Sequence, residues 1–333
     1  MACVLVIGGG LAGCVTAREL ANKGIETLIV EKAPKIGGKV RHYGCKATER
    51  CNQCGLCLVG DLWKQVESHE RIQIWTGSQV LDIEGTRGDF SLRLACPDGL
   101  RTVSGVTDIV VSVGFDTFSL ESTASLEYEP DQGIISGDQL EQLLASRGKH
   151  GVFTQPPASI AFIQCFGSRD IQEKAAYCSR VCCGYSTRAA RVLRQYHPDM
   201  KISFFYMDLQ ELEGEACYNQ LLEEQMEFIR SKPIRIRPGK PNRVLYERPG
   251  SGELVEQEFD MLVLSEGIHP SEDGQRMAEI CKLGFDRNGF LKYVEDPRLS
   301  GIYMAGCVSG PKKIPEVFYE GLQLAWEISG GIL

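Results

Sequence analysis

Residues 3–32 read CVLVIGGGLAGCVTARELANKGIETLIVEK, and this stretch decides the fold. The apolar run at residues 3–7 predicts a buried strand, and the three glycines that follow predict a tight turn. Apolar side chains then recur at helical spacing across residues 11–23, and ETLIVEK predicts a second strand that ends at Glu31. Strand, glycine turn, helix and strand in this order are typical of a dinucleotide-binding βαβ unit.

The glycine turn has the spacing GxGxxG, formed by Gly8, Gly10 and Gly13, with an acidic residue about 20 positions further on. Gly8 permits the tight turn, Gly10 lets the backbone approach a pyrophosphate, and Gly13 allows the helix to pack closely on the strand. The helix N-terminus offers unpaired N–H groups to the phosphates. Glu31 is expected to accept hydrogen bonds from ribose hydroxyls and to disfavour a 2′-phosphate.

Composition limits the classes of function that the chain can have. Its 333 residues, 43% of them hydrophobic, can bury a sizeable core and predict two domains. A net charge of −8 argues against nucleic acid or an anionic membrane as the main partner, and no apolar run is long enough to span a membrane. The N-terminus lacks the features of a signal peptide, so a cytoplasmic location is expected. Fourteen cysteines in a reducing compartment favour metal or redox chemistry over structural disulfides.

The segment after Glu31, KAPKIGGKV, carries a second glycine pair, Gly37 and Gly38. This pair resembles the FAD-binding half of the two-dinucleotide-domain flavoproteins related to glutathione reductase and thioredoxin reductase. TDIVVSVGFDTF (107–118) is similar to the strand that returns under the cofactor in that family. The resemblance implies FAD as the cofactor.

GIYMAGCVSG (301–310) resembles the strand and loop that bring a glycine, here Gly306, to the flavin in that family. A helix follows from about Pro315, and its N-terminus is expected to face the flavin pyrimidine. Lys312 and Lys313 precede this helix and either add positive charge there or are solvated. The residues expected to hold FAD are Gly8, Gly10, Leu11, Ala12, Gly13, Glu31, Lys32, Gly37, Gly38, Lys39, Val80, Gly114, Gly306, Cys307, Lys313 and Ile314.

TQPPAS (154–159) reads as a linker because of its paired prolines. We therefore predict an α/β fold of two dinucleotide-binding-type domains, thioredoxin reductase-like, with the second inserted into the first. The FAD domain then covers 1–153 and 266–333, with a cysteine-rich insertion near 41–60, and the second domain covers 154–265. In the second domain we predict strands at 159–164, 201–208, 233–248 and 254–265 and helices at 184–197 and 216–230.

The second domain lacks a glycine fingerprint after its first strand. The corresponding residues run from Cys165 to Arg169 and read CFGSR, and the bulk of Phe166 and Arg169 would obstruct a pyrophosphate. Direct hydride delivery from NAD(P)H at a standard site is therefore not expected. Asp208 is either a remnant of a ribose-binding acid or an ordinary residue at a strand end.

A first group of cysteines comprises Cys45, Cys51, Cys54 and Cys57. Its CxxCxxC run with a fourth cysteine nearby resembles the loop spacing of ferredoxin-type clusters. A redox dithiol formed by neighbouring cysteines of this run is the main alternative. Zinc is disfavoured because the closely spaced cysteines share their middle residue, and packing alone also remains open.

A second group comprises Cys165, Cys178, Cys182 and Cys183. A disulfide between the two adjacent cysteines would be strained, and one zinc ion is awkward because the side chains of consecutive residues diverge. A [4Fe–4S] cluster relaxes this problem since each thiolate binds a different iron. Cys178 and Cys182 are four residues apart, so on a helix they would share a face. Burial as free cysteines is the remaining alternative.

The second cysteine group lies in YCSRVCCGYSTRAARVLRQYHPDMKISFFYMD, which closely resembles the HdrA flavoprotein subunit of heterodisulfide reductases. In that family the cysteines corresponding to Cys165, Cys178, Cys182 and Cys183 ligate a [4Fe–4S] cluster close to FAD. The family also has CxxC at the place of Cys54 and Cys57. The chain is shorter than the methanogen proteins, so it is most similar to the short HdrA-like proteins of bacterial sulfur-oxidising (sHdr) complexes. Quinone-linked QmoA-type subunits are the second most similar group.

The resemblance implies an oxidoreductase: an electron-transfer subunit with FAD and one or two [4Fe–4S] clusters, in cytoplasmic sulfur oxidation. It further implies HdrB- and HdrC-like partner subunits and a homodimer in isolation, with neither nucleic acid nor a membrane as partner. Electron bifurcation is not expected without ferredoxin modules. Two other hypotheses remain: a self-sufficient NAD(P)H-dependent disulfide or persulfide reductase that uses Cys51, Cys54 and Cys57, and a structural protein that retains FAD and zinc.

Overall fold

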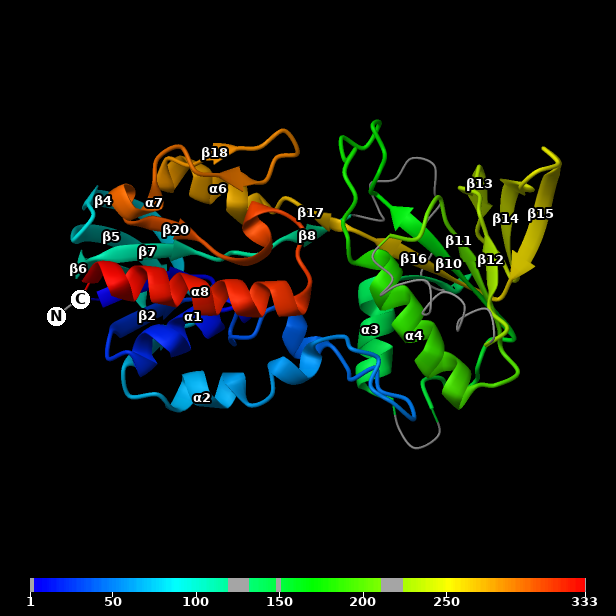
Figure 1. The fold of residues 1–333 in the computed structure, drawn as a ribbon, viewed down its shortest axis with the longest axis horizontal. Coiled ribbons are helices and arrows are strands. Elements are labelled where there is room, and N and C mark those ends of the chain that lie inside the picture. Colours follow the sequence, from blue (N-terminus) through cyan, green and yellow to red (C-terminus); the bar gives the residue numbers. More distant parts are fainter. Residues whose placement is uncertain (1–2, 119–131, 148–150, 211–223, 333) are drawn as a thin grey trace. The chain divides into compact units, whose positions relative to one another are not determined.

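The computed structural model describes residues 3–118, 132–147, 151–210 and 224–332 (Figure 1). The chain forms two compact units, of which the first contains Met1–Arg41, Gly55–Asp116 and His269–Leu333 and the second contains His42–Cys54 and Thr117–Ile268. Each unit is built on a parallel sheet of five strands with helices against it. The predicted α/β class, with a second dinucleotide-binding-type unit inserted into the first, is confirmed.

In the first unit the sheet has the order β20 (Ile302–Met304), β7 (Asp108–Val111), β1 (Cys3–Ile7), β2 (Glu26–Val30) and β3 (Ile72–Trp75). A second, antiparallel sheet consists of β4 (Gln79–Thr86), β5 (Asp89–Cys96) and β6 (Gly99–Val106). One core lies between the two sheets, where buried Leu5 and Val111 meet Phe90 and Leu92. Burial of these side chains is the main force that holds the sheets together.

Helix α1 (Leu11–Asn22) follows β1, and the long α8 (Ile314–Ile332) lies alongside it (Figure 1). The helices approach closely because Gly321 has no side chain: a Cβ atom there would lie 2.9 Å from Val15 Cγ1. Through this contact the C-terminal helix α8 packs against α1, the helix that follows the glycine turn. Both helices begin near that turn.

Shorter elements lie in the first unit or, in the case of η1, β8 and β17, at its boundaries with the second unit. They are η1 (Lys39–His42), η2 (Leu56–Leu58), α2 (Leu62–Ser68), β8 (Asp116–Thr117), β17 (Ile268–His269), α6 (Glu272–Cys281), β18 (Gly284–Phe285), β19 (Leu291–Lys292), α7 (Pro297–Ser300) and η4 (Gly306–Ser309). Within the described part of the chain, no helix has the length and apolarity needed to cross a membrane.

In the second unit the sheet has the order β12 (Glu227–Ile229), β11 (Lys201–Phe205), β10 (Ser159–Phe166), β16 (Met261–Glu266) and β9 (Ile134–Ser136). Helices α3 (Gly137–Ala145) and α4 (Cys182–Tyr196) cover one face, where Leu140, Phe162 and Ala190 are buried together. The other face meets β13 (Arg235–Arg237), β14 (Asn242–Glu247) and β15 (Leu254–Phe259) through residues such as Phe205 and Phe259.

The compact units differ in their limits from the predicted domains. Strand β9 pairs with β16, with Ile134 opposite Leu262, so β9 and the helix after it belong to the second unit. The predicted helix at 216–230 falls partly on residues 211–223, which lie outside the described residues. Its end is wrong, because residues 227–229 form β12, which pairs with β11 through Phe228 and Phe204. The predicted strand at 233–248 is two strands, β13 and β14.

Candidate functional site

The glycine loop after β1 packs tightly against backbone atoms at Gly8 and Gly13, whereas the space beside Gly10 is free. Gly8 has φ +101°, and a Cβ atom there would lie 2.5 Å from the carbonyl oxygen of Ser112. A Cβ at Gly13 would lie 2.1 Å from the carbonyl oxygen of Gly8, whereas one at Gly10 would meet nothing within 4 Å. The free space beside Gly10 is what the close approach of a pyrophosphate requires.

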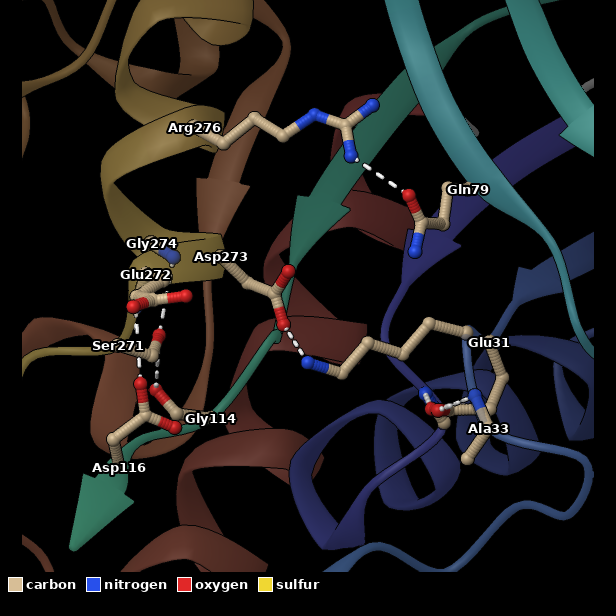
Figure 2. A network of polar contacts seen from close by, with 12 residues as sticks. Glu31, Ala33, Gln79, Gly114, Asp116, Ser271, Glu272, Asp273, Gly274 and Arg276 are labelled. Atoms are coloured by element: carbon tan, nitrogen blue, oxygen red, sulfur yellow. Dashed lines mark hydrogen bonds and ion pairs between the residues drawn. The ribbon is translucent and has the colours of Figure 1, made fainter. Parts of the chain in front are cut away.

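Glu31, at the end of β2, holds the loop in shape. Its side chain is buried, with Oε2 accepting a 2.6 Å hydrogen bond from the Gly9 N–H and Oε1 a 2.7 Å bond from the Ala33 N–H (Figure 2). Each carboxylate oxygen keeps a second lone pair for a ribose hydroxyl. Glu31 therefore supports the loop itself, a role that its place in the fingerprint did not predict.

The second glycine pair lies against the first loop. The Gly37 N–H donates a 2.6 Å hydrogen bond to the carbonyl oxygen of Gly9, and a Cβ atom at Gly38 would lie 3.1 Å from Gly10 Cα. Leu11 and Ala12 are buried in the first turn of α1, and the structure thus brings these predicted residues together around one loop.

A polar network joins the ends of β2 and β4 to α6 (Figure 2). Lys32 forms an ion pair with Asp273 in the first turn of α6. Arg276, one turn later, donates hydrogen bonds of 2.6 Å to the Val80 carbonyl oxygen and 2.9 Å to Gln79 Oε1. Two of the predicted cofactor residues, Lys32 and Val80, are therefore fixed by side chains that the motif analysis did not single out.

The start of α6 is also fixed to the segment that runs from the end of β7 into β8. The Ser271 hydroxyl accepts a 3.0 Å hydrogen bond from the Gly274 N–H and donates one of 3.4 Å to the carbonyl oxygen of Gly114 (Figure 2). The Glu272 N–H donates a 3.0 Å hydrogen bond to Asp116 Oδ2. The predicted residue Gly114 thus lies in the loop between β7 and β8, in contact with the N-cap residue of α6.

The loop after β20 brings Gly306 to α1, since a Cβ atom at Gly306 would lie 2.8 Å from the Cβ of Ala12. The Gly306 N–H donates to Glu320 Oε2 at 2.7 Å, and Lys312 Nζ donates to the Gly306 carbonyl oxygen at 2.7 Å. Lys312 also forms a 2.9 Å ion pair with Glu320 of α8, so this lysine neutralises a carboxylate of the helix that follows its loop.

The remaining predicted residues of this region lie at the start of α8 and in η1 and η4. The Lys313 N–H donates a 2.7 Å hydrogen bond to Glu316 Oε2, which satisfies a donor just before Ile314 begins the helix. Burial raises the pKa of the Cys307 thiol to about 11, so this cysteine is protonated at neutral pH. Lys39 begins η1 beside the second glycine pair.

The first cysteine group does not lie within one compact unit, because Cys45, Cys51 and Cys54 belong to the second unit and Cys57 to the first. Cys45, Cys51 and Cys57 are exposed, and Cys54 is half-buried.

Residues 42–54 are anchored to the second unit by a buried ion pair between Lys46 and Glu141, whose side chains are 5% and 9% exposed. Burial raises the pKa of Glu141, and the charge of Lys46 opposes this effect. Asn52 Nδ2 donates to the Lys46 carbonyl oxygen at 2.6 Å, and Arg188 Nε donates to the Asn52 carbonyl oxygen at 2.7 Å. The segment with three of the cysteines is therefore part of the packed second unit.

The second cysteine group lies at the carboxyl end of β10 and the start of α4. Cys165 is near the end of the strand, with φ +59°, and Cys182 and Cys183 are the first residues of the helix. Cys178 precedes the helix, so the expectation that Cys178 and Cys182 share a helix face is wrong. Arg180, with φ +63°, interrupts helical geometry between them.

The Cys182 thiol interacts with the thiols of Cys165 and Cys183, and these interactions together with burial raise its pKa. The neighbouring Cys182 thiol and the positive charge of Arg169 lower the pKa of the Cys165 thiol to about 7. Arg169 is itself paired with Asp208, which follows β11. Among the described residues, however, no group of three or more His, Cys, Asp or Glu side chains is arranged to hold a metal ion. The assignment of either cysteine group as cluster ligands stays a prediction.

The turn after β10 has no open glycine like Gly10. A Cβ atom at Gly167 in this turn would lie 2.1 Å from Phe118 Cγ, and one at Gly267, which follows the neighbouring strand β16, would lie 1.9 Å from Ser179 Oγ of the turn. The hydroxyls of Ser168 and Ser179 are fully buried and 2.5 Å apart. Side chains therefore fill the space in which a second fingerprint would place its phosphates.

The fold defines the class of this protein. Residues 6–58 match the family model described as an NAD(P)-binding Rossmann-like domain. The structure is similar to thioredoxin reductase from T. acidophilum, with a TM-score of 0.66 and 18% identity over 99% of this chain and 98% of that one. Thioredoxin reductase from Lactococcus lactis gives a TM-score of 0.64 at 18% identity over 100% and 99% of the two chains. The fold is thus the two-unit, thioredoxin reductase-like fold.

The sequence relatives are more specific, and they are HdrA subunits of methanogen heterodisulfide reductases. The chain is 26% identical to an iron-sulfur HdrA subunit of the CoB–CoM heterodisulfide reductase of Methanopyrus kandleri, over 95% of this chain and 62% of the relative. It is 26% identical to the HdrA subunit of the ferredoxin/F420H2-dependent CoB–CoM heterodisulfide reductase of Methanosarcina acetivorans, over 98% and 52% of the respective lengths. The predicted similarity to HdrA is confirmed, and the chain spans between half and two thirds of the length of these relatives.

Proposed function

We propose that the chain is an oxidoreductase: a FAD- and [4Fe–4S]-containing electron-transfer subunit of a heterodisulfide reductase-like complex. One contrast carries the proposal. The turn after β1 is open at Gly10, whereas the turn after β10 is filled and has Cys165 beside Cys182 and Cys183. One unit therefore keeps a dinucleotide loop, and the other has thiols where its phosphate loop would lie.

The residues of the first unit fit FAD. The Gly10 backbone and the start of α1 would bind the pyrophosphate, and the free lone pairs of Glu31 would accept from the ribose hydroxyls. The Gly306 loop, held by Glu320 and Lys312, would orient the isoalloxazine side of the cofactor. A bound flavin supplies electron transfer in steps of one or two electrons.

The donor set of the second cysteine group suits iron and sulfide, since Cys165, Cys178, Cys182 and Cys183 offer four soft thiolates and no carboxylate. The first turn of α4 adds unpaired N–H groups and a positive dipole end, which favour the negative charge of thiolates. A bound [4Fe–4S] cluster supplies one-electron transfer. The name of the Methanopyrus relative, which calls it an iron-sulfur subunit, supports this reading.

The finer proposal is a role in cytoplasmic sulfur oxidation with HdrB- and HdrC-like partners, around a homodimer of this chain. It draws on the motif resemblance to the short HdrA-like proteins. Cys45, Cys51, Cys54 and Cys57 would hold a second cluster in that case, or act as redox thiols. A quinone-linked, QmoA-type role would change the partner and leave both cofactors the same.

Anaerobic reconstitution tests the function. The wild-type chain is expected to hold one FAD and about four irons and four acid-labile sulfides, or about eight of each with two clusters. Cys182→Ala is expected to lose the cluster of the second group and keep FAD. Cys96→Ala, a change in β5 outside both cysteine groups, is the matched control and should keep both. FAD without iron or sulfide in the wild-type chain would overturn the proposal.

A self-sufficient NAD(P)H-dependent disulfide or persulfide reductase is a second candidate. The exposure of Cys51 and Cys57 favours it, because exposed thiols can reach a disulfide substrate. Rapid reduction of the flavin by NADH or NADPH alone would support this candidate, and slow reduction by both would eliminate it.

A further inference from the structure

Gln164, on β10 directly before Cys165, has a buried side chain that forms no hydrogen bond with any residue of the described ranges. The residue is 6% exposed, and neither Oε1 nor Nε2 of its amide has a partner there. Buried amides in folded proteins are nearly always paired, so an unpaired one calls for an explanation such as a group that binds there. Its place in the sheet indicates which group.

Side chains alternate along a strand, so Gln164 lies on the same face of the sheet as Phe162. Phe162 packs in one core with Ala190 and Leu193 of α4. A crossover helix runs antiparallel to the strand before it. Gln164, two residues closer than Phe162 to the carboxyl end of β10, therefore lies closer to the first turns of α4. Those turns begin with Cys182.

The end of β10 is irregular in a way that supports this placement. The pairing of β10 with β16 shifts register between Ile163 and Phe166, as in a β-bulge. Regular alternation would put Cys165 on the face opposite α4, yet its thiol interacts with the thiol of Cys182, the first residue of α4. A bulge at this point can turn Cys165 toward the start of α4, which is on the face of the sheet that Gln164 shares with Phe162.

We propose that Gln164 donates an N–H···S hydrogen bond to the iron–sulfur cluster of the second cysteine group. This inference rests on the proposed function. The helix start alone would not define a site, but the unpaired amide is an independent sign that a group binds there. Gln164 acts as a positioning residue that adjusts the cluster and carries no electrons itself.

The physical effect follows from charge. Reduction adds one negative charge to the cluster, and a donor hydrogen bond to sulfur stabilises the more negative state. Removing the donor makes reduction harder and moves the midpoint potential to a lower value. Arg169, which interacts with Cys165 and is paired with Asp208, acts in the same direction from a more exposed position.

Gln164→Leu tests the proposal, because leucine has a similar volume and no donor. Gln172→Leu, a change at an exposed glutamine of the same turn region, is the matched control. With iron and sulfide contents equal, a redox titration followed by electron paramagnetic resonance is expected to show a lower potential for Gln164→Leu only. A tenfold change in the reduction equilibrium corresponds to about 59 mV for one electron. An unchanged potential in a cluster-loaded Gln164→Leu variant overturns the proposal.

A second measurement tests the proposal on the wild-type chain, in case the Gln164→Leu variant does not fold or does not bind iron. In the wild-type chain with 15N-labelled glutamine, pulsed electron paramagnetic resonance of the reduced cluster is expected to detect coupling to an amide nitrogen. Gln172→Leu should keep this coupling, and its absence in the wild type overturns the proposal. Absence of any cluster in the reconstituted wild type would overturn the proposed function and this inference together, an outcome distinct from a cluster without the coupling.

Discussion

Gly10 and Gly13 belong to the same fingerprint, yet the structure separates their roles. Replacing Gly13 by alanine puts a Cβ atom 2.1 Å from the Gly8 carbonyl oxygen and 2.7 Å from Ser112 Oγ. Replacing Gly10 by alanine meets nothing within 4 Å, and its φ of −74° suits alanine. We therefore expect Gly13→Ala to destabilise the cofactor-free protein and Gly10→Ala to impair cofactor binding.

The two magnitudes can be worked from these distances. Overpacking against backbone costs about 1–3 kcal/mol of unfolding free energy, which lowers the melting temperature by roughly 2–4 °C per kcal/mol for a unit of this size. Gly10 is the N-cap of α1, where alanine in place of glycine costs less than about 1 kcal/mol. Loss of one charge-assisted hydrogen bond to the pyrophosphate costs about 1.5–3 kcal/mol, which weakens FAD binding roughly 10- to 150-fold.

Urea unfolding of the FAD-free variants and titration with FAD, followed by flavin fluorescence, measure the two effects separately. Gly24→Ala is not a suitable control because of its positive φ, whereas Gly330, in α8, has open space around it and suits alanine. Equal destabilisation by Gly10→Ala and Gly13→Ala would refute the reasoning. A correctly folded Gly10→Ala variant with wild-type FAD affinity would also refute it.

Three further predictions concern Glu31, the Lys46–Glu141 ion pair and the Cys165 thiol. Glu31→Gln turns an amide N–H toward a backbone N–H, and should lower the unfolding free energy of the FAD-free protein by about 1–3 kcal/mol in urea melts. An unchanged unfolding free energy would contradict the role of Glu31 in holding the glycine loop. Lys46→Met leaves Glu141 buried without its cation and should cost about 3–5 kcal/mol and expose residues 42–54 to proteases. The double change with Glu141→Leu should restore most of that loss, and a purely additive loss would argue against the pair. In the cluster-free protein, alkylation of Cys165 should rise to half its maximum near pH 7, because the lowered pKa yields thiolate above that value, while Cys281, with a pKa raised by burial to about 12, stays unreactive.

Local patterns predicted the first unit well. A strand, a glycine turn and a helix are specified by neighbouring residues, so residues 3–30 form β1, α1 and β2 as expected. The roles of the loop residues were harder to predict, because Glu31 acts on Gly9 and Ala33 through bonds that depend on the folded shape of the turn.

The second unit depends more on contacts between distant residues. Lys46 and Glu141 are 95 positions apart, and no local pattern indicates that they attach the cysteine segment 42–54 to the second unit. The turn between β10 and α4 contains non-glycine residues with positive φ, among them Cys165 and Arg180, which helical spacing cannot anticipate. The unpaired Gln164 looked in sequence like one more residue of a buried strand.

The side chain of Glu31 also bears on how the protein takes up its cofactor in the cell. Its hydrogen bonds to Gly9 and Ala33, with that from Gly37 to Gly9, shape the loop using the chain's own groups alone. Because the first unit also contains His269–Leu333, it is complete only after the whole chain has been synthesised, and these bonds then hold the loop in shape before flavin binds. Newly made polypeptide can accumulate as a competent acceptor when flavin is scarce, and loading then follows supply rather than the rate of synthesis.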